Sequence, residues 1–431
     1  MLKTLVLMIA AALGLTTPVA SGDNSPERGP SALTVLTGIY SKDAPYVAPK
    51  PAIKAPPEGY AMVFIENIGR HGSRASTSDA NEDEVLEEWE DASNENALTP
   101  LGESLGADVE SFRDAEEKIG YGNLSTRGRI EWQGIGARTA ANYPTFFKSL
   151  EDLKWSLDST TTPVYRTKQS VAALESGLMA KHPNLNLGEK YADKDLVNFG
   201  SSRSRQGSRD LKAIMEGPDV VIASTNVLKR VYTADYVESL NDPVEKALEL
   251  YALYCIAASM SEDTDVTFTE YIDKKDAAVL GYARDAEKFY KYGPGVEGEN
   301  GTYEGADLLL DDFFDALDAR VDGGSHATVF RVAHGETTMP FAALLQLPGS
   351  EKQAAPGVPY TYDNNPWRGD KIGGMAGNIE WVAYQHLDNK SVVVTMRYNE
   401  KPIKFLSACT PISEDSYFYT PTELKSCLPS S

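Results

Sequence analysis

Residues 61–74, AMVFIENIGRHGSR, join an apolar run to a histidine that stands between two arginines. The apolar residues Ala61–Ile65 predict a buried β-strand, and Gly72 allows a turn in which the backbone comes close to a ligand. An imidazole nitrogen can attack phosphorus, and guanidinium groups match the oxygens of a phosphate. The stretch therefore predicts a phosphate site with His71 as nucleophile, although a surface turn with two solvated arginines would have the same sequence.

A second histidine follows a second predicted strand. Residues His326–Ala333 are typical of a buried strand, and Met339–Leu345 predict a helix with a proline in its first turn. His334 and Glu336 lie between these two elements. In open α/β sheets, ligands bind at the carboxyl ends of the strands. A lone histidine there is usually a core or turn residue, so the pairing of His71 with His334 is what predicts a catalytic site.

Arg166 is a third candidate. It lies in Val164–Thr167, directly before Ser170–Met179, where the apolar positions 171, 174 and 178 share one face of a predicted helix. A helix N-terminus favours anions, so an arginine beside it adds to a phosphate site. Alone, Arg166 would fit an ordinary surface position.

Together, the segments RHGSR (70–74), YRTKQS (165–170) and HGET (334–337) resemble the histidine acid phosphatases, the second branch of the histidine phosphatase superfamily. Within that family the chain is most similar to the multiple inositol-polyphosphate phosphatases, which act as phytases. Most acid phosphatases have His-Asp at the second site, whereas this subgroup has His-Ala-Glu and the present chain has His-Gly-Glu. The resemblance runs from about residue 60 to about residue 410 and includes Leu124–Gly128 with Gly134–Gly136, Tyr282–Tyr290, Met375–Ile379 and Tyr398–Pro402.

The resemblance implies a mechanism. His71 would attack the phosphorus in line and form a phosphohistidine, while Glu336 would protonate the leaving alcohol and later activate water. Four further side chains would hold the equatorial oxygens and offset their charge in the transition state: Arg70, Arg74, Arg166 and His334. This scheme requires no metal and no other cofactor, and no cluster of histidine, cysteine and aspartate has metal-ligand spacing in the sequence.

Two positions depart from the family pattern. Ala75-Ser76 follows RHGSR where relatives often have an aromatic residue or Pro-Thr, so the resemblance does not say which residues form the rim of the pocket. Gly335 replaces an alanine, and because glycine frees the backbone we expect Glu336 to be held less firmly. We still assign Glu336 as the proton donor, since position 335 carries no acid.

The resemblance implies an α/β fold, with a doubly wound, mainly parallel sheet, helices on both faces and an inserted α-helical cap domain. The first 22 residues contain Lys3, the apolar run Leu5–Leu15 and the small residues Val19–Gly22. This pattern predicts a cleaved signal peptide and a periplasmic or secreted protein. The expected organisation is a signal peptide (1–22), a leader packed along the surface (23–58), an α/β core (59–185 and 305–431) and a helical cap insertion (186–304).

The formal net charge of −22 argues against nucleic acid or an anionic membrane as a partner. No apolar run is long enough for a membrane span. A polyphosphate substrate conflicts with the acidic charge unless arginines concentrate in the pocket. We expect a small polyphosphorylated substrate and a monomer or weak oligomer.

Several residues outside the motifs have expected roles. Lys168 is a candidate substrate contact because it lies close to Arg166 in sequence. Cys409 and Cys427 can form a disulfide in an exported protein, whereas Cys255, in an apolar stretch, is expected to be a buried thiol. The basic loop 203–209 either contacts outer phosphates or is a solvated turn, and its candidates are Arg203, Arg205 and Arg209.

Three classes of function remain. The first is a phosphomonoester hydrolase, acting on inositol phosphates or as a general acid phosphatase. The second is a phosphoglycerate mutase-like transferase, which also uses a phosphohistidine but does not suit an exported protein with this placement of HGET. The third is a non-catalytic polyanion-binding protein on the same fold, against which the presence of both histidines, the arginines and Glu336 argues.

Overall fold

The computed structural model describes residues 38–50 and 52–429. The predicted signal peptide (1–22) and part of the predicted leader lie outside these residues. The described part of the leader contains the short 3₁₀ helix η1 (Ser41–Asp43). Tyr40, Ser41 and Tyr46 are buried, so this part enters the molecule and does not simply pack along its surface as expected.

A seven-stranded sheet forms the centre of the α/β part, with strand order β3-β2-β4-β1-β5-β6-β7. Strands β3, β2, β4 and β1 are parallel, and β5, β6 and β7 are antiparallel to their neighbours. The α/β prediction is confirmed, with a parallel core and an antiparallel extension. The strands are β1 (Tyr60–Arg70), β2 (Ser156–Thr161), β3 (Asn186–Ala192), β4 (Thr328–Ala333), β5 (Asn378–His386), β6 (Val392–Tyr398) and β7 (Lys401–Ile403).

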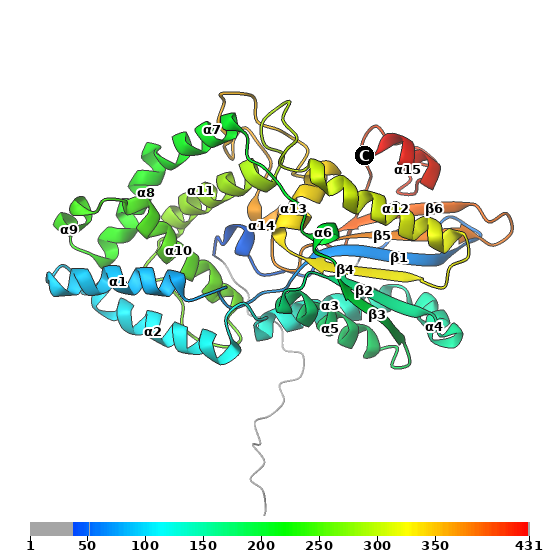
Figure 1. Cartoon of the computed structure of the whole chain (residues 1–431), viewed down its shortest axis with the longest axis horizontal. Coiled ribbons are helices and arrows are strands. Elements are labelled where there is room, and N and C mark those ends of the chain that lie inside the picture. The colour runs from blue at the N-terminus through cyan, green and yellow to red at the C-terminus, as the bar shows by residue number, and fades with distance from the viewer. Residues whose placement is uncertain (1–37, 51, 430–431) are drawn as a thin grey trace, which may run out of the picture. The chain divides into compact units, whose positions relative to one another are not determined.

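Helices cover both faces of the sheet (Figure 1). Phe64 and Ile65 are consecutive in β1 and therefore point to opposite faces. Phe64 shares a core cluster with Phe341, and Ile65 shares another with Leu174. One face carries α3 (Thr126–Asn142), α4 (Pro144–Leu153) and α5 (Tyr165–Met179), and the other carries α12 (Asp307–Val321) and α13 (Gly335–Leu344).

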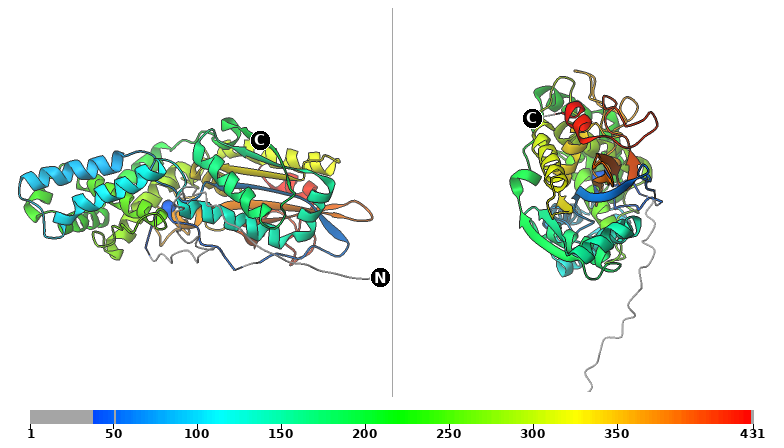
Figure 2. Two further views of the ribbon diagram at one scale, coloured as in Figure 1. Left: turned by 90° about the horizontal axis from the view of Figure 1, so that it is seen from below. Right: turned by 90° about the vertical axis from the view of Figure 1, so that its right-hand side faces the viewer.

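A helical part lies beyond one end of the strands (Figure 1), and the left-hand view of Figure 2 shows it from below. Its helices bury apolar faces against one another, as Val109, Leu228 and Leu253 do in one cluster. The helices are α1 (Ala80–Asn94), α2 (Gly102–Ile119), α7 (Arg205–Met215), α8 (Pro218–Val231), α9 (Ala234–Ser239), α10 (Pro243–Ser259) and α11 (Lys274–Tyr292).

Two segments lie in a different part of the fold from the one expected. Helices α1 and α2 fall within the predicted core segment 59–185, yet they contact α10 and α8, because apolar residues such as Leu105 and Phe112 face the helical part. Strand β3 falls within the predicted insertion 186–304, yet it pairs in parallel with β2. The helical part is thus formed by two separate stretches of chain.

The C-terminal segment contains a disulfide between Cys409 and Cys427, whose Cα atoms are 5.2 Å apart, and Cys255 is a buried free thiol. Among residues 38–50 and 52–429, no helix combines the length and the apolar character needed to cross a membrane. The remaining short elements are α6 (Lys194–Val197), η2 (Glu304–Ala306), α14 (Gly369–Ile372) and α15 (Pro421–Cys427).

Candidate active site

The register of the sheet places the two histidines side by side. Strands β1 and β4 are parallel neighbours, and Arg70 at the end of β1 pairs with Ala333 at the end of β4. His71 and His334 are the next residues, so they leave the sheet at the same edge. The backbone N–H of His71 donates to the Ala333 carbonyl at 2.9 Å, and the imidazole ring centroids are 5.5 Å apart. The structure thus brings together the two histidines that the motifs singled out.

His71 is buried, and one of its ring nitrogens has a fixed partner. Nδ1 lies 2.9 Å from the carbonyl oxygen of Gly72. A carbonyl can only accept, so Nδ1 carries the proton and Nε2 keeps a lone pair. Burial, together with the guanidinium groups of Arg70, Arg166 and Arg74, holds the pKa of His71 well below its usual value. The ring is therefore neutral even in mildly acidic solution, as a nucleophilic nitrogen must be.

The loop after β1 is held by the first turns of α3. A Cβ atom on Gly72 would lie 2.6 Å from the carbonyl oxygen of Gly128, and a Cβ atom on Gly128 would lie 2.0 Å from that of Ser73. The Glu131 carboxylate accepts from the backbone N–H and from the hydroxyl of Ser73, each at 2.8 Å. In this structure the close approach that Gly72 permits is to the backbone of α3, and its expected approach to a ligand stays a prediction.

The Arg70 guanidinium is held on the side that faces η1 and α14. Its Nη1 donates to the carbonyl oxygens of Lys42 and Gly373, and its Nη2 donates to Oδ1 of Asp43 at 3.1 Å. The Nε of Arg70 is buried and has no hydrogen-bond partner within the described chain. Arg70 therefore keeps one buried donor for a ligand.

Arg74 and Arg166 also use one guanidinium nitrogen in a hydrogen bond and keep a buried Nε without a partner among the described residues. Arg74 Nη1 donates to the Ala75 carbonyl at 2.7 Å, and Arg166 Nη2 lies 3.3 Å from Nδ1 of His334, but neither buried Nε has a partner in the part that the structure describes. Burial and repulsion from Arg74 and Arg70 lower the pKa of Arg166 to about 10. Leaving a buried donor unpaired costs about 1–3 kcal/mol. A phosphate between the three arginines would supply the missing acceptors.

His334 orients Arg166. Because a guanidinium can only donate, Nδ1 of His334 is the acceptor for Arg166, and Nε2 carries the proton and donates to Oγ1 of Thr162 at 3.0 Å. Burial and the Arg166 charge lower the pKa of His334 to about 4. Both ring nitrogens are thus engaged, so a direct contact between His334 and a phosphate requires one of these hydrogen bonds to be exchanged.

Two helices begin earlier than predicted and bring their N-termini to the site. Helix α5 begins at Tyr165 and α13 at Gly335, so Arg166 and Glu336 lie in first turns. Pro340, expected in the first turn of its helix, lies in the interior of α13. Unpaired N–H groups and the helix dipole at both N-termini favour an anion between them.

Glu336 is partly buried beside the arginines. Burial favours its neutral form, but Lys42, Arg70 and its own backbone N–H outweigh burial and lower the pKa of Glu336. Gly335 does not loosen this position as expected, because it is the first residue of α13. A Cβ atom on Gly335 would lie 3.3 Å from the terminal methyl of Met339, so the site nearly accommodates the alanine of the family pattern.

Sequence reasoning missed a group of charged residues beside the arginines. Lys42 and Asp43 belong to η1, Arg284 and Lys288 belong to α11, and together with Arg74 they line a cavity of about 180 Å³. Burial lowers the pKa of Lys42 to about 8, although Asp43 acts in the opposite direction. Arg284 and Lys288 lie in Tyr282–Tyr290, one of the segments that carry the family resemblance, so the sequence could have indicated them. No motif marks the residues of η1.

The four outer basic candidates do not line this cavity. Lys168 is exposed on α5. Arg203 Nη2 donates to the carbonyl oxygen of Glu287 at 3.3 Å, so this side chain lies against α11. Arg205 and Arg209 are exposed in the first turns of α7, where a loop was expected.

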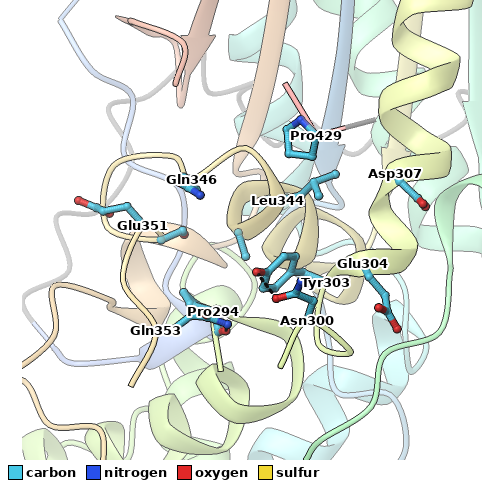
Figure 3. Close-up of a pocket in the computed structure, with 12 residues that line it drawn as sticks. Pro294, Asn300, Tyr303, Glu304, Asp307, Leu344, Gln346, Glu351, Gln353 and Pro429 are labelled. Atoms are coloured by element: carbon cyan, nitrogen blue, oxygen red, sulfur yellow. Dashed lines mark hydrogen bonds between the residues drawn. The ribbon is translucent and has the colours of Figure 1, made fainter. Parts of the chain in front are cut away.

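A larger cavity of about 310 Å³ has a different character (Figure 3). Its lining includes the carboxylates of Glu304, Asp307 and Glu351 and none of the candidate catalytic residues. It also includes Leu344, which lies about 13 Å along α13 from Gly335. The cavity is therefore separate from the histidines. Among the residues that the structure describes, no group of three or more His, Cys, Asp or Glu side chains could hold a metal ion.

Comparisons with known proteins agree with this geometry. The model of the histidine phosphatase superfamily (branch 2) matches residues 62–399. The multiple inositol polyphosphate phosphatase of Bifidobacterium longum, in complex with inositol hexasulfate, is 28% identical with a TM-score of 0.85, over 91% of this chain and 98% of that chain. The phytase from D. castellii shares the fold at 13% identity and a TM-score of 0.65, over 89% of this chain and 83% of that chain. A search among curated proteins gave no match. Because the family match spans most of the sequence, this chain belongs to branch 2 of the histidine phosphatase superfamily.

Proposed function

We propose that this protein is an exported phosphomonoester hydrolase that removes phosphates from inositol polyphosphates through a phosphohistidine intermediate. One observation carries the proposal. The neutral His71 stands among Arg70, Arg74 and Arg166, each of which has a buried Nε without a partner among the described residues. A phosphate at this place gives all three arginines an acceptor and presents phosphorus to Nε2 of His71.

The reaction proceeds in two steps. In the first, Nε2 of His71 attacks phosphorus, the ester P–O bond breaks, and Glu336 in its acid form gives its proton to the leaving alcohol. The three arginines stabilise the charge on the equatorial oxygens. In the second step, water gives a proton to Glu336 and attacks phosphorus, the P–N bond breaks, and inorganic phosphate leaves while His71 becomes neutral again.

Substrate binding itself prepares Glu336 for the first step. In the free site, Lys42 and Arg70 lower the pKa of this carboxyl group. A phosphate ester brings negative charge to the same cations and offsets their effect, so the pKa of Glu336 rises on binding. We therefore expect the highest activity at acidic to near-neutral pH.

The basic cavity beside Arg74 favours a substrate with several phosphates. While one phosphate of an inositol ring occupies the catalytic arginines, its neighbours lie a few ångströms away, where Lys42, Arg284 and Lys288 supply positive charge. The Bifidobacterium longum relative was crystallised with inositol hexasulfate, a polyanion of the same shape. A general acid phosphatase, the second candidate function, has no use for this additional charge.

Export is supported by two features. Residues 1–22 have the pattern of a signal peptide, and the disulfide between Cys409 and Cys427 suits an oxidising compartment. N-terminal sequencing of the protein from the periplasm or medium of the producing cells tests this part. A mature terminus close to residue 23 supports export, and an intact Met1 on cytosolic protein contradicts it.

The activity is tested by phosphate release from phytate and from an aryl phosphate, from acidic to neutral pH, with His71→Ala as the blank. We expect a clear preference for phytate and no turnover by the folded variant. Activity on the aryl ester alone would make the protein a general acid phosphatase. Turnover by His71→Ala would exclude the phosphohistidine mechanism.

A further inference from the structure

The chain ahead of the family match also reaches the catalytic site. The match begins at residue 62, whereas η1 (Ser41–Asp43) lies well before it. On one side of η1, the Tyr251 hydroxyl of α10 donates to the Ile39 carbonyl at 2.9 Å. On the other side, the Tyr46 backbone N–H donates to Glu131 of α3 at 2.9 Å. The segment therefore bridges the helical part and the α/β part, and it carries its two charged residues to the arginines.

Asp43 is a carboxylate at the edge of a site built for anions. Its Oδ1 accepts from Nζ of Lys42 at 2.9 Å and from Nη2 of Arg70 at 3.1 Å. Burial opposes the charge of Asp43, but Lys42, Arg70 and Arg74 outweigh burial and hold its pKa well below the usual value. Asp43 is therefore ionised throughout the working pH range, where its charge repels a phosphate.

We propose that Asp43 is a positioning residue, which fixes the Arg70 guanidinium and the Lys42 ammonium at the edge of the phosphate site. Two carbonyl oxygens hold Nη1 of Arg70, and Asp43 is the partner of Nη2, so the guanidinium plane is set on both arms. This leaves the buried Nε and the second N–H of Nη2 as donors for a ligand. The inference rests on the proposed function only in taking a phosphate group as the ligand.

The sign of the effect on affinity separates positioning from simple repulsion. If Asp43 contributes only its charge, removing the carboxylate strengthens phosphate binding, because one repulsive charge is lost. If Asp43 positions Arg70, removing it weakens binding, because a guanidinium that is not held in place loses the directional hydrogen bonds that an arginine makes to phosphate.

The test is calorimetric titration of the full chain with inorganic phosphate at mildly acidic pH. We expect Asp43→Ala to bind phosphate roughly tenfold more weakly, as for a lost hydrogen bond between charged groups. Asp43→Asn keeps Oδ1 as an acceptor for Arg70 without the charge, so we expect it to bind phosphate as tightly as the wild type or more tightly. Unchanged or tighter binding by Asp43→Ala would overturn the proposal.

Tyr46→Phe is the matched control on the same segment. It removes the hydroxyl that donates to Oε1 of Glu400 at 2.9 Å, and within the described chain this hydroxyl has no hydrogen bond to Arg70, Arg74 or Arg166. We expect a lower melting temperature and an unchanged phosphate affinity at a temperature where the protein is folded. If Tyr46→Phe weakened phosphate binding as much as Asp43→Ala did, the segment would matter only for folding and the positioning role would be wrong.

A pH series provides a second readout through Lys42. Asp43 raises the pKa of Lys42, so Asp43→Asn brings it from about 8 toward neutral pH. Inositol hexasulfate is the probe, since its sulfate groups keep their charge. As the pH rises, Lys42 loses its charge and the affinity for the probe decreases. We expect this decrease to occur at a lower pH in Asp43→Asn than in the wild type, and to be absent from Lys42→Met. The other charged or titratable groups near Lys42 are Arg70, Arg74, Cys255, Glu287, Lys288 and Glu336.

Coincident pH profiles of the wild type and Asp43→Asn would show that Asp43 does not hold Lys42. Neither titration depends on hydrolysis. A failure of the proposed substrate in the activity assay therefore leaves this test intact, and the two failures are distinguishable.

Discussion

A buried pair of carboxyl groups next to the catalytic loop should make the stability of this protein depend on pH. Glu82 of α1 and Glu116 of α2 are fully buried and within hydrogen-bonding distance of each other. The Tyr121 hydroxyl donates to Glu82 at 3.3 Å, and the Ser76 backbone N–H donates to Glu116 at 2.5 Å. Two ionised carboxylates cannot hydrogen-bond to each other, so we expect Glu116 to keep its proton and to share it with its neighbour. Ser76 lies two residues after Arg74, so Glu116 also anchors the loop that carries Arg74.

The magnitude follows from the proton balance. Burial and the contact with Glu82 raise the pKa of Glu116 to about 9 from an ordinary value of 4.5. Between these two values the folded state holds one proton more than the unfolded state, so the free energy of unfolding decreases by about 1.4 kcal/mol for each unit that the pH rises. The stabilisation is complete below the ordinary pKa and is lost as the pH approaches the raised one. From pH 6 to pH 8 the pair should remove about 3 kcal/mol.

Glu82→Gln tests this loss of about 3 kcal/mol between pH 6 and pH 8. The amide of glutamine can donate to an ionised Glu116, so no shared proton is needed, and its carbonyl oxygen can still accept from Tyr121. The free energy of unfolding is measured in urea at both pH values. We expect the wild type to lose about 3 kcal/mol more than Glu82→Gln between them. Glu87→Gln, which changes an exposed carboxyl on the same helix, is the control and should follow the wild type. Equal losses in the wild type and Glu82→Gln would refute the shared proton.

Four further predictions concern the loop after β1 and α13. Glu336→Gln should lower kcat/KM for phytate far more than for an aryl phosphate, whose leaving group needs little protonation. Equal losses in kcat/KM, which reports the steps up to release of the alcohol, would remove Glu336 from the donor role. In the wild type the alkaline limb of kcat should lie at higher pH than that of kcat/KM, because bound phosphate raises the pKa of Glu336. Gly72→Ala places Cβ 2.6 Å from a backbone oxygen of α3, so we expect a lower melting temperature by calorimetry and a loss of activity. Gly335→Ala places Cβ 3.3 Å from the flexible methyl of Met339 and in ordinary van der Waals contact with Nε of Arg70 at 3.5 Å. It should therefore keep its activity and unfold in urea with a free energy unchanged or up to about 1 kcal/mol higher.

Strands and helices could be predicted where a local pattern marks them. Strand β4 is an apolar run that ends in a polar motif, so its carboxyl end was located from the sequence. The edge strand β3, with sequence NLGEKYA, has no apolar run, because most of its side chains are exposed. Helix α1 is rich in acidic residues and has a narrow apolar face that includes Val85 and Leu86. The role of this face follows only from the packing of α1 on α10.

The side chains that orient the site were beyond sequence reasoning for a different reason. His71, His334 and Arg166 lie in motifs, but the partner of His334 is Thr162, which is 172 residues away and is reached through the pairing of β2 with β4. Asp43 lies in a leader that was expected to pack along the surface. A single threonine or aspartate has no pattern of its own, so its role arises only from a long-range contact.

The acidic chain and the proposed anionic substrate are compatible because charges act over short distances. The net charge of −22 is spread over many exposed carboxylates, and at physiological ionic strength such charges are screened beyond about 8 Å. Buried and partly buried charges in contact with a ligand are screened much less, since little water separates them. Arg70, Arg74, Arg166 and Lys42 are such charges, opposed at close range by Asp43 and Glu336. The sign of the potential at His71 is therefore determined by these few side chains, and the net charge of the chain says little about what the site binds.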